Sequence, residues 1–292
     1  METGKVAYLQ NRRDGLSVRE FRRRPEGVIL EMTDSFATHN IAHRSTIPRK
    51  GEVGAALNVF WLKEVLSPES VDHHLLAFGS ELKKEVPEQS LRRRSLLVRQ
   101  TSEVPIEFVF RFYLAGSLGD DHYRASVKAD PVNAYGLDLP LGVSRMTRFP
   151  NPVLTPKDAF QQPLSRDRVF ERYPLAVKTG SFVSGLIQDH LNSVGLELID
   201  ITLKFGFLKD GQLLLVGNIG NPDSMRVACQ REVDHGREPS DLLAREAERQ
   251  WGDGLRIPLL FPQEMLEEAA CRYQELFYLI TGRWLDEFQS EF

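Results

Sequence analysis

The sequence is poor in cysteine and has almost no excess of charge of either sign. Its two cysteines, Cys229 and Cys271, are too few to form a metal cluster by themselves. A single long-range disulfide is not expected in a reducing compartment, so both residues are predicted to be ordinary thiols. Lys and Arg number 37 against 41 Asp and Glu, a net charge of -4. A global basic field, which drives nucleic-acid binding, is therefore missing, and nucleic acid is not an expected partner.

Long apolar runs are also missing. The longest falls far short of the roughly 20 residues that cross a bilayer, and the N-terminal segment METGKVAYLQNRRDG has no apolar signal region. We therefore expect a cytoplasmic protein that does not bind membranes. The length of 292 residues allows one large domain, or two smaller domains with a cleft between them. The sequence leaves a homodimer open.

Apolar spacing predicts a mixture of helices and strands. Glycines at the ends of two helical patterns, Gly195 and Gly282, are typical C-terminal stops. Lys209-Asp210-Gly211 suits the tight turn of a hairpin. Strands are predicted at 28–32, 96–99, 106–112, 199–207 and 213–216, and helices at 55–66, 181–194 and 262–281.

The segment PIEFVFRFYLAGS, residues 105–117, carries the first candidate site. It reads as a strand that ends in Ala115-Gly116-Ser117, with Arg111 shortly before. Small residues let main-chain N–H groups approach an anion, and an arginine can clamp that anion with two hydrogen bonds. An ordinary glycine turn is the other interpretation.

The segment NPDSMR, residues 221–226, carries the second candidate site. It offers the carboxylate of Asp223, the hydroxyl of Ser224 and the guanidinium of Arg226 after a proline turn. These groups suit a ribose phosphate. Taken alone, the segment is equally an exposed turn whose Asp–Arg pair is worth under about 1 kcal/mol.

Together these segments resemble the SAICAR synthetases, the purine-pathway ligases that join aspartate to a carboxyaminoimidazole ribotide using ATP. Residues 105–117 are similar to the family's stretch that ends in "R-N-Y-x-A-G-S", and 221–226 to its "TPDSSR". Residues 47–51 (IPRKG), 150–156 (PNPVLTP) and 279–282 (LITG) resemble three further family motifs in the same order. The resemblance covers nearly the whole chain.

The resemblance implies an α+β fold with two lobes. A small N-terminal lobe, residues 1–103, would be built like the nucleotide-binding lobe of kinases and ATP-grasp proteins. A larger C-terminal α+β lobe, residues 104–292, would hold the ribotide, and the substrate would lie in the cleft between the lobes. The implied partner is a small-molecule nucleotide. Substrate-binding positions carried over from the family are Arg111, Ser117, Asp223, Ser224, Arg226, Lys50 and Arg245.

The departures from the family concern its ATP and magnesium positions. Magnesium needs hard anionic oxygens, and Lys204 stands where the family has a glutamate. At about 4 Å and an effective dielectric of about 20, each attraction turned into repulsion is worth several kcal/mol. The sequence therefore predicts a degenerate ATP site with no metal and no cofactor. The other positions where family ATP or metal contacts are replaced are Leu16, Val18, Asn40, Gln161, Gln162, Asn218 and Ile219.

Three functions follow as hypotheses. The first is an ATP-independent ring-forming or C–C bond-forming step on an imidazole or purine nucleotide, in the biosynthesis of purine-analogue antibiotics such as coformycin and pentostatin. In it Asp200 would be the acid–base group, and Lys204 an electrostatic stabiliser or Schiff-base former. The second is an ATP-dependent SAICAR synthetase with a displaced metal site, which would need ATP and magnesium. The third is a catalytically inactive ribotide-binding protein.

Overall fold

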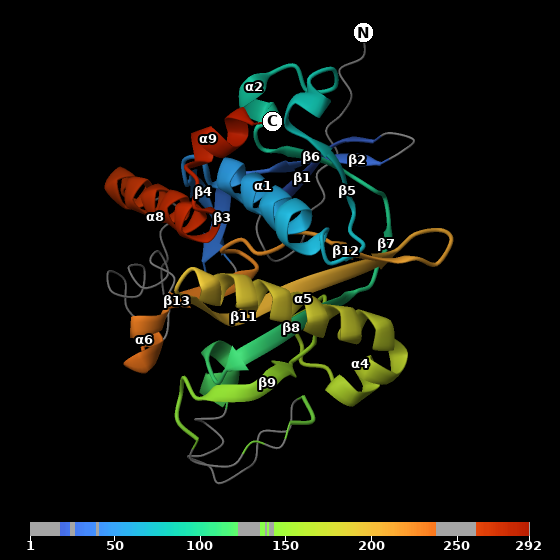
Figure 1. Cartoon of the computed structure of the whole chain (residues 1–292), viewed down its shortest axis with the longest axis vertical. Coiled ribbons are helices and arrows are strands. Elements are labelled where there is room, and N and C mark those ends of the chain that lie inside the picture. Colours follow the sequence, from blue (N-terminus) through green and yellow to red (C-terminus); the bar gives the residue numbers. More distant parts are fainter. Residues whose placement is uncertain are drawn as a thin grey trace. The chain divides into compact units, whose positions relative to one another are not determined.

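The chain folds as two units (Figure 1). A computed structural model describes residues 18–23, 27–38, 41–121, 135–137, 139, 143–237 and 261–291. The first unit contains the described residues of Met1–Phe60, His74–Gln100 and Ser240–Phe292, and the second contains those of Trp61–His73 and Thr101–Pro239. The α+β fold class predicted from the sequence is confirmed. Among the described helices, none has the length and apolarity that a membrane span requires.

A four-stranded antiparallel sheet forms the centre of the first unit. Its strand order is β1-β2-β6-β5. The strands are β1 (Val18–Arg23), β2 (Val28–Met32), β5 (Leu75–Phe78) and β6 (Ser95–Val98), and a separate hairpin joins β3 (Ser35–Thr38) to β4 (Ile41–Thr46). The helices of the unit are α1 (Lys50–Phe60), η2 (Gly79–Leu82), α2 (Gln89–Arg92), α8 (Gln263–Thr281) and α9 (Leu285–Ser290).

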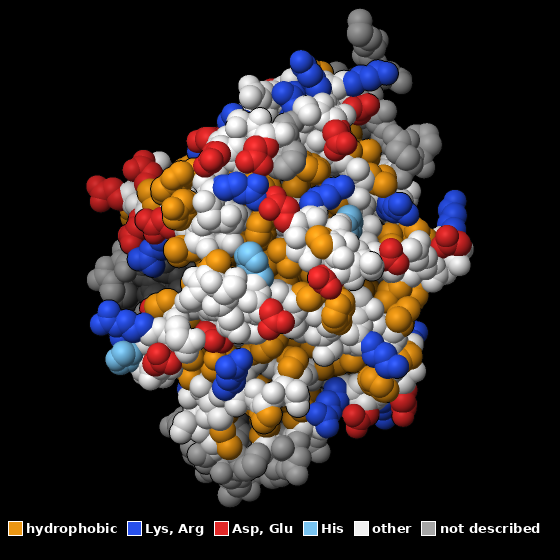
Figure 2. Space-filling model, in the orientation of Figure 1, with side chains coloured by type: hydrophobic (Ala, Val, Ile, Leu, Met, Phe, Trp, Pro, Cys, Tyr) orange, Lys and Arg blue, Asp and Glu red, His pale blue; other side chains and the backbone are white. Residues whose placement is uncertain are grey.

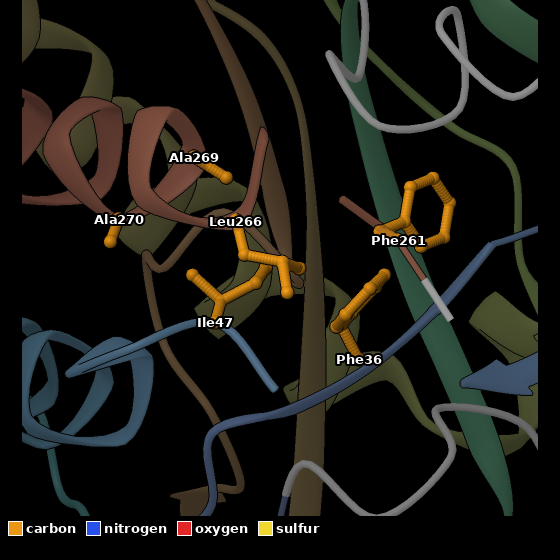
Figure 3. Packing of buried hydrophobic residues seen from close by; sticks show 6 residues of the cluster. All are labelled: Phe36, Ile47, Phe261, Leu266, Ala269 and Ala270. Carbon is orange, nitrogen blue, oxygen red and sulfur yellow. The ribbon is translucent and has the colours of Figure 1, made fainter. Parts of the chain in front are cut away.

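One apolar cluster of the first unit joins the β3–β4 hairpin to α8 (Figure 3). The rings of Phe36 and Phe261 lie 5.5 Å apart at an angle of 55°. Leu266, Ala269 and Ala270 contribute one face of α8, at the spacing of an amphipathic helix. Burying a Phe or Leu side chain contributes about 1.5–3 kcal/mol, so this cluster holds the C-terminal helix to the unit.

The start of α1 differs from the sequence prediction. The helix begins at Lys50, five residues before the predicted start at 55, and residues Trp61–Leu66 continue it as the π-helix η1. The early turn carries Gly51, at which a Cβ would lie 2.2 Å from the backbone oxygen of Met32. Glycine is needed because the helix touches the strand backbone there. The prediction used the spacing of apolar residues, and the first turn of the helix does not show this spacing.

A seven-stranded sheet forms the second unit, with the path β10-β8-β11-β12. The 12-residue strand β11 also pairs with β7 and β13, and β8 also pairs with β9. The strands are β7 (Ser102–Glu103), β8 (Ile106–Tyr113), β9 (Arg148–Leu154), β10 (Lys157–Asp158), β11 (Leu196–Phe207), β12 (Leu213–Val216) and β13 (Met225–Cys229). Its helices include η1, α4 (Arg166–Arg172), α5 (Pro174–Ser193) and α6 (Gln230–Asp234).

Most predicted elements are confirmed with small changes of boundary. Strands β2 and β12 match their predicted bounds, and β6, β8 and β11 start or end within three residues of them. The stops at Gly195 and Gly282 are confirmed, because φ is 78° and 71° at these glycines. Helix α5 begins at Pro174 rather than at 181, with the proline in its first turn. Both cysteines are free thiols, as predicted, and both are exposed.

The division into units differs from the predicted boundary at residue 103. The described C-terminal residues 261–291 group with the first unit, because the apolar face of α8 packs against α1 and the β3–β4 hairpin. Residues 61–73 group with the second unit. Figure 2 shows Lys and Arg side chains scattered among acidic ones on the face in view, in keeping with the small net charge.

Two glycines of α5 provide a matched test of how this helix packs. A Cβ at Gly180 would lie 2.5 Å from Cε2 of the buried Phe110 on β8, whereas a Cβ at Gly185 would meet nothing within 4 Å. Gly180→Ala should therefore lower the free energy of unfolding by about 1–3 kcal/mol. Gly185→Ala should raise it by about 0.5–1 kcal/mol, because alanine is favoured in a helix interior. Urea unfolding of both variants measures the difference, and equal effects would contradict the packing of α5 on β8.

Candidate functional site

Three charged residues lie side by side on neighbouring strands of the second unit. In the antiparallel register, Asp200 of β11 is opposite Arg111 of β8 on one side and Arg226 of β13 on the other. Directly opposed residues share a face of a sheet, with Cβ atoms about 4.5–5.5 Å apart. A bulge in the β11–β13 pairing next to Asp200 adjusts the direction of the side chains. The sheet itself therefore brings the two predicted sites together.

Asp200 accepts hydrogen bonds from both guanidinium groups. Nη1 of Arg111 donates to Oδ2 at 2.8 Å, and Nε of Arg226 donates to Oδ1 at 3.0 Å. Nη2 of Arg226 also donates to Oδ2, so Arg226 binds the carboxylate with two parallel hydrogen bonds. Asp200 and Arg111 are buried, at 9 % and 4 % exposure, whereas the side chain of Arg226 is 31 % exposed. We call these three residues the Arg–Asp–Arg row.

The turn after β8 completes the surroundings of the row. Arg111 donates from Nε to Oγ1 of the fully buried Thr155 at 2.8 Å and from Nη2 to Oγ of Ser117 at 3.2 Å. Gly116, with φ at 57°, lies directly against Arg226, and a Cβ there would be 2.6 Å from its Nη2. The Ala-Gly-Ser turn is thus not an ordinary glycine turn, since its glycine makes room for a guanidinium.

The charges of the row shift the pKa of nearby groups. Burial would raise the pKa of Asp200, but the hydrogen bond and charge of Arg226 and the charges of Arg111 and Lys157 hold it below its usual value. Burial and Arg111 lower the pKa of Lys157, which Glu107 and Asp200 partly counteract. A carboxylate held in this way is a poor proton donor near neutral pH. The geometry therefore favours a positioning role for Asp200 over the predicted acid–base role.

The row leaves an excess of positive charge beside exposed donors. Two guanidinium groups and one carboxylate give the row itself a net charge of +1, and the nearby Lys157 is balanced by the carboxylates of Glu107 and Asp121. The exposed Ser117 and the partly exposed Arg226 lie close together at the row. The hydroxyl of Ser117 contacts Arg111, and Arg226 contacts Asp200. Such a set of donors, fixed in advance by Asp200, can bind a phosphate or carboxylate.

A second polar cluster lies on β8 and β11. Nζ of Lys204 is 3.3 Å from Oε1 of Glu107, and Nε2 of Gln161 donates to Oε2 of the same carboxylate at 2.5 Å. Gln161 reaches this position from a backbone with φ at 61°. Lys204 and Glu107 are both partly buried, at 26 % and 18 % side-chain exposure. The predicted residues Lys204 and Gln161 are thus brought together by a glutamate that the sequence analysis did not select.

The other predicted ATP and metal positions offer few oxygen ligands for a cation. Ile219 is fully buried and apolar. Oδ1 of Asn218 is buried and has no hydrogen-bond donor among the described residues. Gln162 is exposed, and its side chain donates to the backbone oxygen of Phe160 at 3.3 Å. Within the described part of the chain, no group of three or more His, Cys, Asp or Glu residues is arranged to hold a metal ion.

The NPDSMR segment forms a compact turn before β13. Oδ1 of the buried Asn221 accepts from the backbone N–H groups of Asp223 and Ser224, at 3.0 and 3.1 Å. Asp223 is exposed and Ser224 is half-buried. The backbone of Thr202 donates to the oxygen of Ser224 at 2.7 Å, which fastens the turn to β11. Asp223 is therefore presented at the surface by a rigid turn that ends at Arg226.

The remaining predicted positions divide between the first unit and the part of the chain outside the described residues. Lys50 is the buried first residue of α1, and Val18 is the half-buried first residue of β1. Leu16, Asn40 and Arg245 lie outside the described residues.

Sequence reasoning missed Thr155, Lys157 and Glu107 as site residues. Thr155 lies in the PNPVLTP motif and Lys157 comes directly after it. The resemblance of this motif to the family was a signal that could have found them. Glu107 had none, because its role depends on the register of β8 against β10 and β11.

Comparison with known proteins identifies the family. The family model "SAICAR synthetase" matches residues 17–255, so the chain belongs to the SAICAR synthetase family. The phosphoribosylaminoimidazole-succinocarboxamide synthase of Mycobacterium leprae (strain TN) is 29 % identical over 282 residues, which cover 90 % of each chain. The enzyme of the same name from Schizosaccharomyces pombe is 24 % identical over 274 residues, 89 % of each. The chain is therefore a member of a family of enzymes of purine nucleotide metabolism.

Solved structures confirm the fold. The SAICAR synthase from Saccharomyces cerevisiae complexed with SAICAR superimposes with a TM-score of 0.80 at 20 % identity, over 97 % of each chain. A type-2 SAICAR synthetase in complex with ADP gives a TM-score of 0.60 at 20 % identity, over 92 % of this chain and 97 % of the other.

The Arg–Asp–Arg row makes a prediction about stability. Asp200→Asn should lower the free energy of unfolding by about 3–5 kcal/mol at neutral pH, because it removes the buried carboxylate that pairs with both guanidinium groups. Asp189→Asn, at an exposed position on α5, should change it by less than about 0.5 kcal/mol. Chemical denaturation of both variants tests this.

The same row predicts a dependence on pH. Because the pKa of Asp200 is lower in the folded than in the unfolded chain, its contribution is complete above the unfolded value and is lost as the pH falls through the folded value. The stability difference between wild type and Asp200→Asn should therefore shrink in acid. A difference that stays constant down to the most acidic reversible condition would contradict the ionised row.

Proposed function

We propose that the protein binds the phosphate of an imidazole ribotide at the Arg–Asp–Arg row, and that its reaction is the one for which its relatives are named. That reaction joins aspartate to a carboxyaminoimidazole ribotide. The support is the family match over residues 17–255 together with relatives of 24–29 % identity that share about nine-tenths of their length with this chain. The yeast structure, solved with SAICAR, shows that the same fold can hold the product of this reaction.

The single observation that carries ribotide binding is the arrangement of the row. Asp200 holds Arg226 by two hydrogen bonds and Arg111 by one, so the two cations are fixed before any ligand arrives. Fixed donors bind an anion without the entropic cost of ordering long side chains. Arg226 and Ser117 are the members of the site open to solvent, so they are the groups that would contact a phosphate first.

The fit of magnesium at the second polar cluster is poor. The carboxylate of Glu107 is already paired with the ammonium of Lys204 and accepts a hydrogen bond from Gln161. A divalent cation there would have to displace the ammonium, and Ile219 supplies no oxygen ligand. These residues do not form the ligand set that magnesium prefers. The described residues at this position therefore do not support a catalytic step through ATP and magnesium.

This misfit favours a second candidate function, an ATP-independent step on the same kind of ribotide. Ring formation or C–C bond formation needs no phosphoryl activation, and Lys204 held beside Glu107 would stabilise negative charge that develops on the substrate. The proposed setting is the biosynthesis of specialised purine-analogue nucleosides. The cytoplasmic location and the homodimer stay predictions.

A turnover experiment separates the candidates. The full-length protein is incubated with carboxyaminoimidazole ribotide, aspartate and MgATP, and ADP and the succinocarboxamide product are measured by chromatography. Stoichiometric ADP and product support the ligase reaction. Ribotide binding in calorimetry without ADP release rejects the ligase and leaves the ATP-independent step or a catalytically inactive binding protein. Absence of ribotide binding contradicts the proposal as a whole.

Arg226 should dominate ribotide affinity. Arg226→Gln should weaken binding of carboxyaminoimidazole ribotide by about 10-fold or more, because one charge-assisted pair of hydrogen bonds to the phosphate is lost. Arg231→Gln removes the same charge from an exposed position on α6 and should leave the affinity unchanged. Isothermal titration calorimetry measures both, with thermal unfolding as the control for folding. An equal loss in the two variants would mean that binding follows net charge rather than the row.

A charge reversal tests the role assigned to Lys204. Lys204→Glu places a second carboxylate beside Glu107, so without divalent cations it should lower the free energy of unfolding by about 1 kcal/mol or more. Added Mg²⁺ should restore stability by bridging the two carboxylates. Lys209→Glu, in the exposed turn between β11 and β12, should respond to Mg²⁺ as wild type does. If wild type is itself stabilised by Mg²⁺ as strongly as Lys204→Glu, the ammonium does not occupy the metal position.

A further inference from the structure

A hollow of about 290 Å³ lies within the first unit, between α1, α2 and α9. Its floor is made by small and apolar side chains of α1 and by Leu96 of β6, and Phe288 of α9 closes one side. All of its lining residues belong to the first unit, whereas the Arg–Asp–Arg row belongs to the second. It is therefore a feature that the proposed function does not use.

Small side chains on α1 leave the hollow open. Ala55 and Ala56 are 3 % and 4 % exposed, and Val59 follows one turn later on the same helix. A larger residue in place of either alanine would fill part of the space. Protein interiors are normally packed to the density of organic crystals, because an empty hollow forfeits dispersion contacts along its lining. An apolar floor of this kind suits the flat face of an aromatic ligand.

The charged part of the lining is basic. Lys83, Arg92 and Arg93 line the hollow, and no Asp or Glu is present among its described lining residues. Nη1 of Arg92 donates to the backbone oxygens of Val86 and Pro87, both at 2.9 Å, which fixes the guanidinium at the rim. Guanidinium groups fixed in this way bind carboxylates and phosphates, and a concave surface concentrates their field.

The charge of Arg93 is only weakly compensated. Its Nη1 lies 3.7 Å from Oδ1 of Asp286, a carboxylate that does not line the hollow and that is 65 % exposed. The same carboxylate accepts a shorter contact of 2.6 Å from Nη2 of Arg49. Asp286 is thus engaged mainly by Arg49, and the basic character of the hollow is kept.

We propose that this hollow is a binding site for a small aromatic anion. The anionic group would meet the guanidinium groups of Arg92 and Arg93 and the ammonium of Lys83. The ring would lie against the apolar floor on α1. The site goes beyond the proposed function, and failure of either proposal leaves the other untouched because they rest on different units.

Two probes of nearly equal size test the proposal on the full-length protein. Benzoate has the ring and the anion, whereas benzamide has the ring without the charge. In amide-detected NMR titrations at millimolar concentration, benzoate should shift the signals of Ser80, Leu96 and Gln289, and benzamide should bind about 10-fold more weakly. Equal affinities for the two probes, or no shifts at these residues, would overturn the proposal.

Matched variants localise the effect. Lys83→Met should weaken the binding of benzoate about 3-fold, a modest loss because this lysine is exposed. Lys84→Met, at the next exposed residue, which does not line the hollow, should not change the affinity. Equal losses in the two lysine variants would contradict the site.

Discussion

The carboxylate of Asp200 between two guanidinium groups is the interaction on which the second unit depends. It lies where β8, β11 and β13 run side by side, so one buried anion fixes side chains from three strands. Arg111 is a buried cation, and its hydrogen bonds to Thr155, Ala115 and Ser117 are all to neutral groups, whereas Asp200 supplies an opposite charge. The same carboxylate leaves Arg226 oriented but partly exposed, and this is how a structural ion pair also prepares a binding site for an anion.

The second polar cluster shows how few side chains decide whether a point on the sheet suits a metal ion. The row, on β8, β11 and β13, and the Lys204–Glu107 pair, on β8 and β11, share two strands but have different requirements. The row needs only three charged side chains at opposed positions, and the pairing of the strands places them there. A magnesium site needs several anionic oxygens at one point, and here the one carboxylate is occupied by an ammonium and an amide. Membership of the SAICAR synthetase family therefore fixes the fold, while the chemistry depends on a few side chains.

The sequence predicted the elements and many site residues because their signals are local. Alternating apolar residues and glycine stops defined β2, β8, β11, β12 and α8, and motif resemblance identified Arg111, Ser117 and Arg226. The parts that it missed depend on contacts between distant segments. The early start of α1 follows from the approach of Gly51 to β2, and the role of Glu107 follows from strand register. No local pattern records that Asp200 would be held by two arginines rather than free to exchange protons.

The most direct test of this account is the titration of Asp200 followed by carbon-13 NMR of its side-chain carboxyl group. The account predicts that the resonance keeps the chemical shift of the ionised form well below the pH at which exposed aspartates protonate, because Arg226 and Arg111 lower its pKa. Protonation of Asp200 at or above the usual pKa of an aspartate would contradict it. In that case the two guanidinium groups would not be fixed by a carboxylate, and the proposed anion site would lose its physical basis.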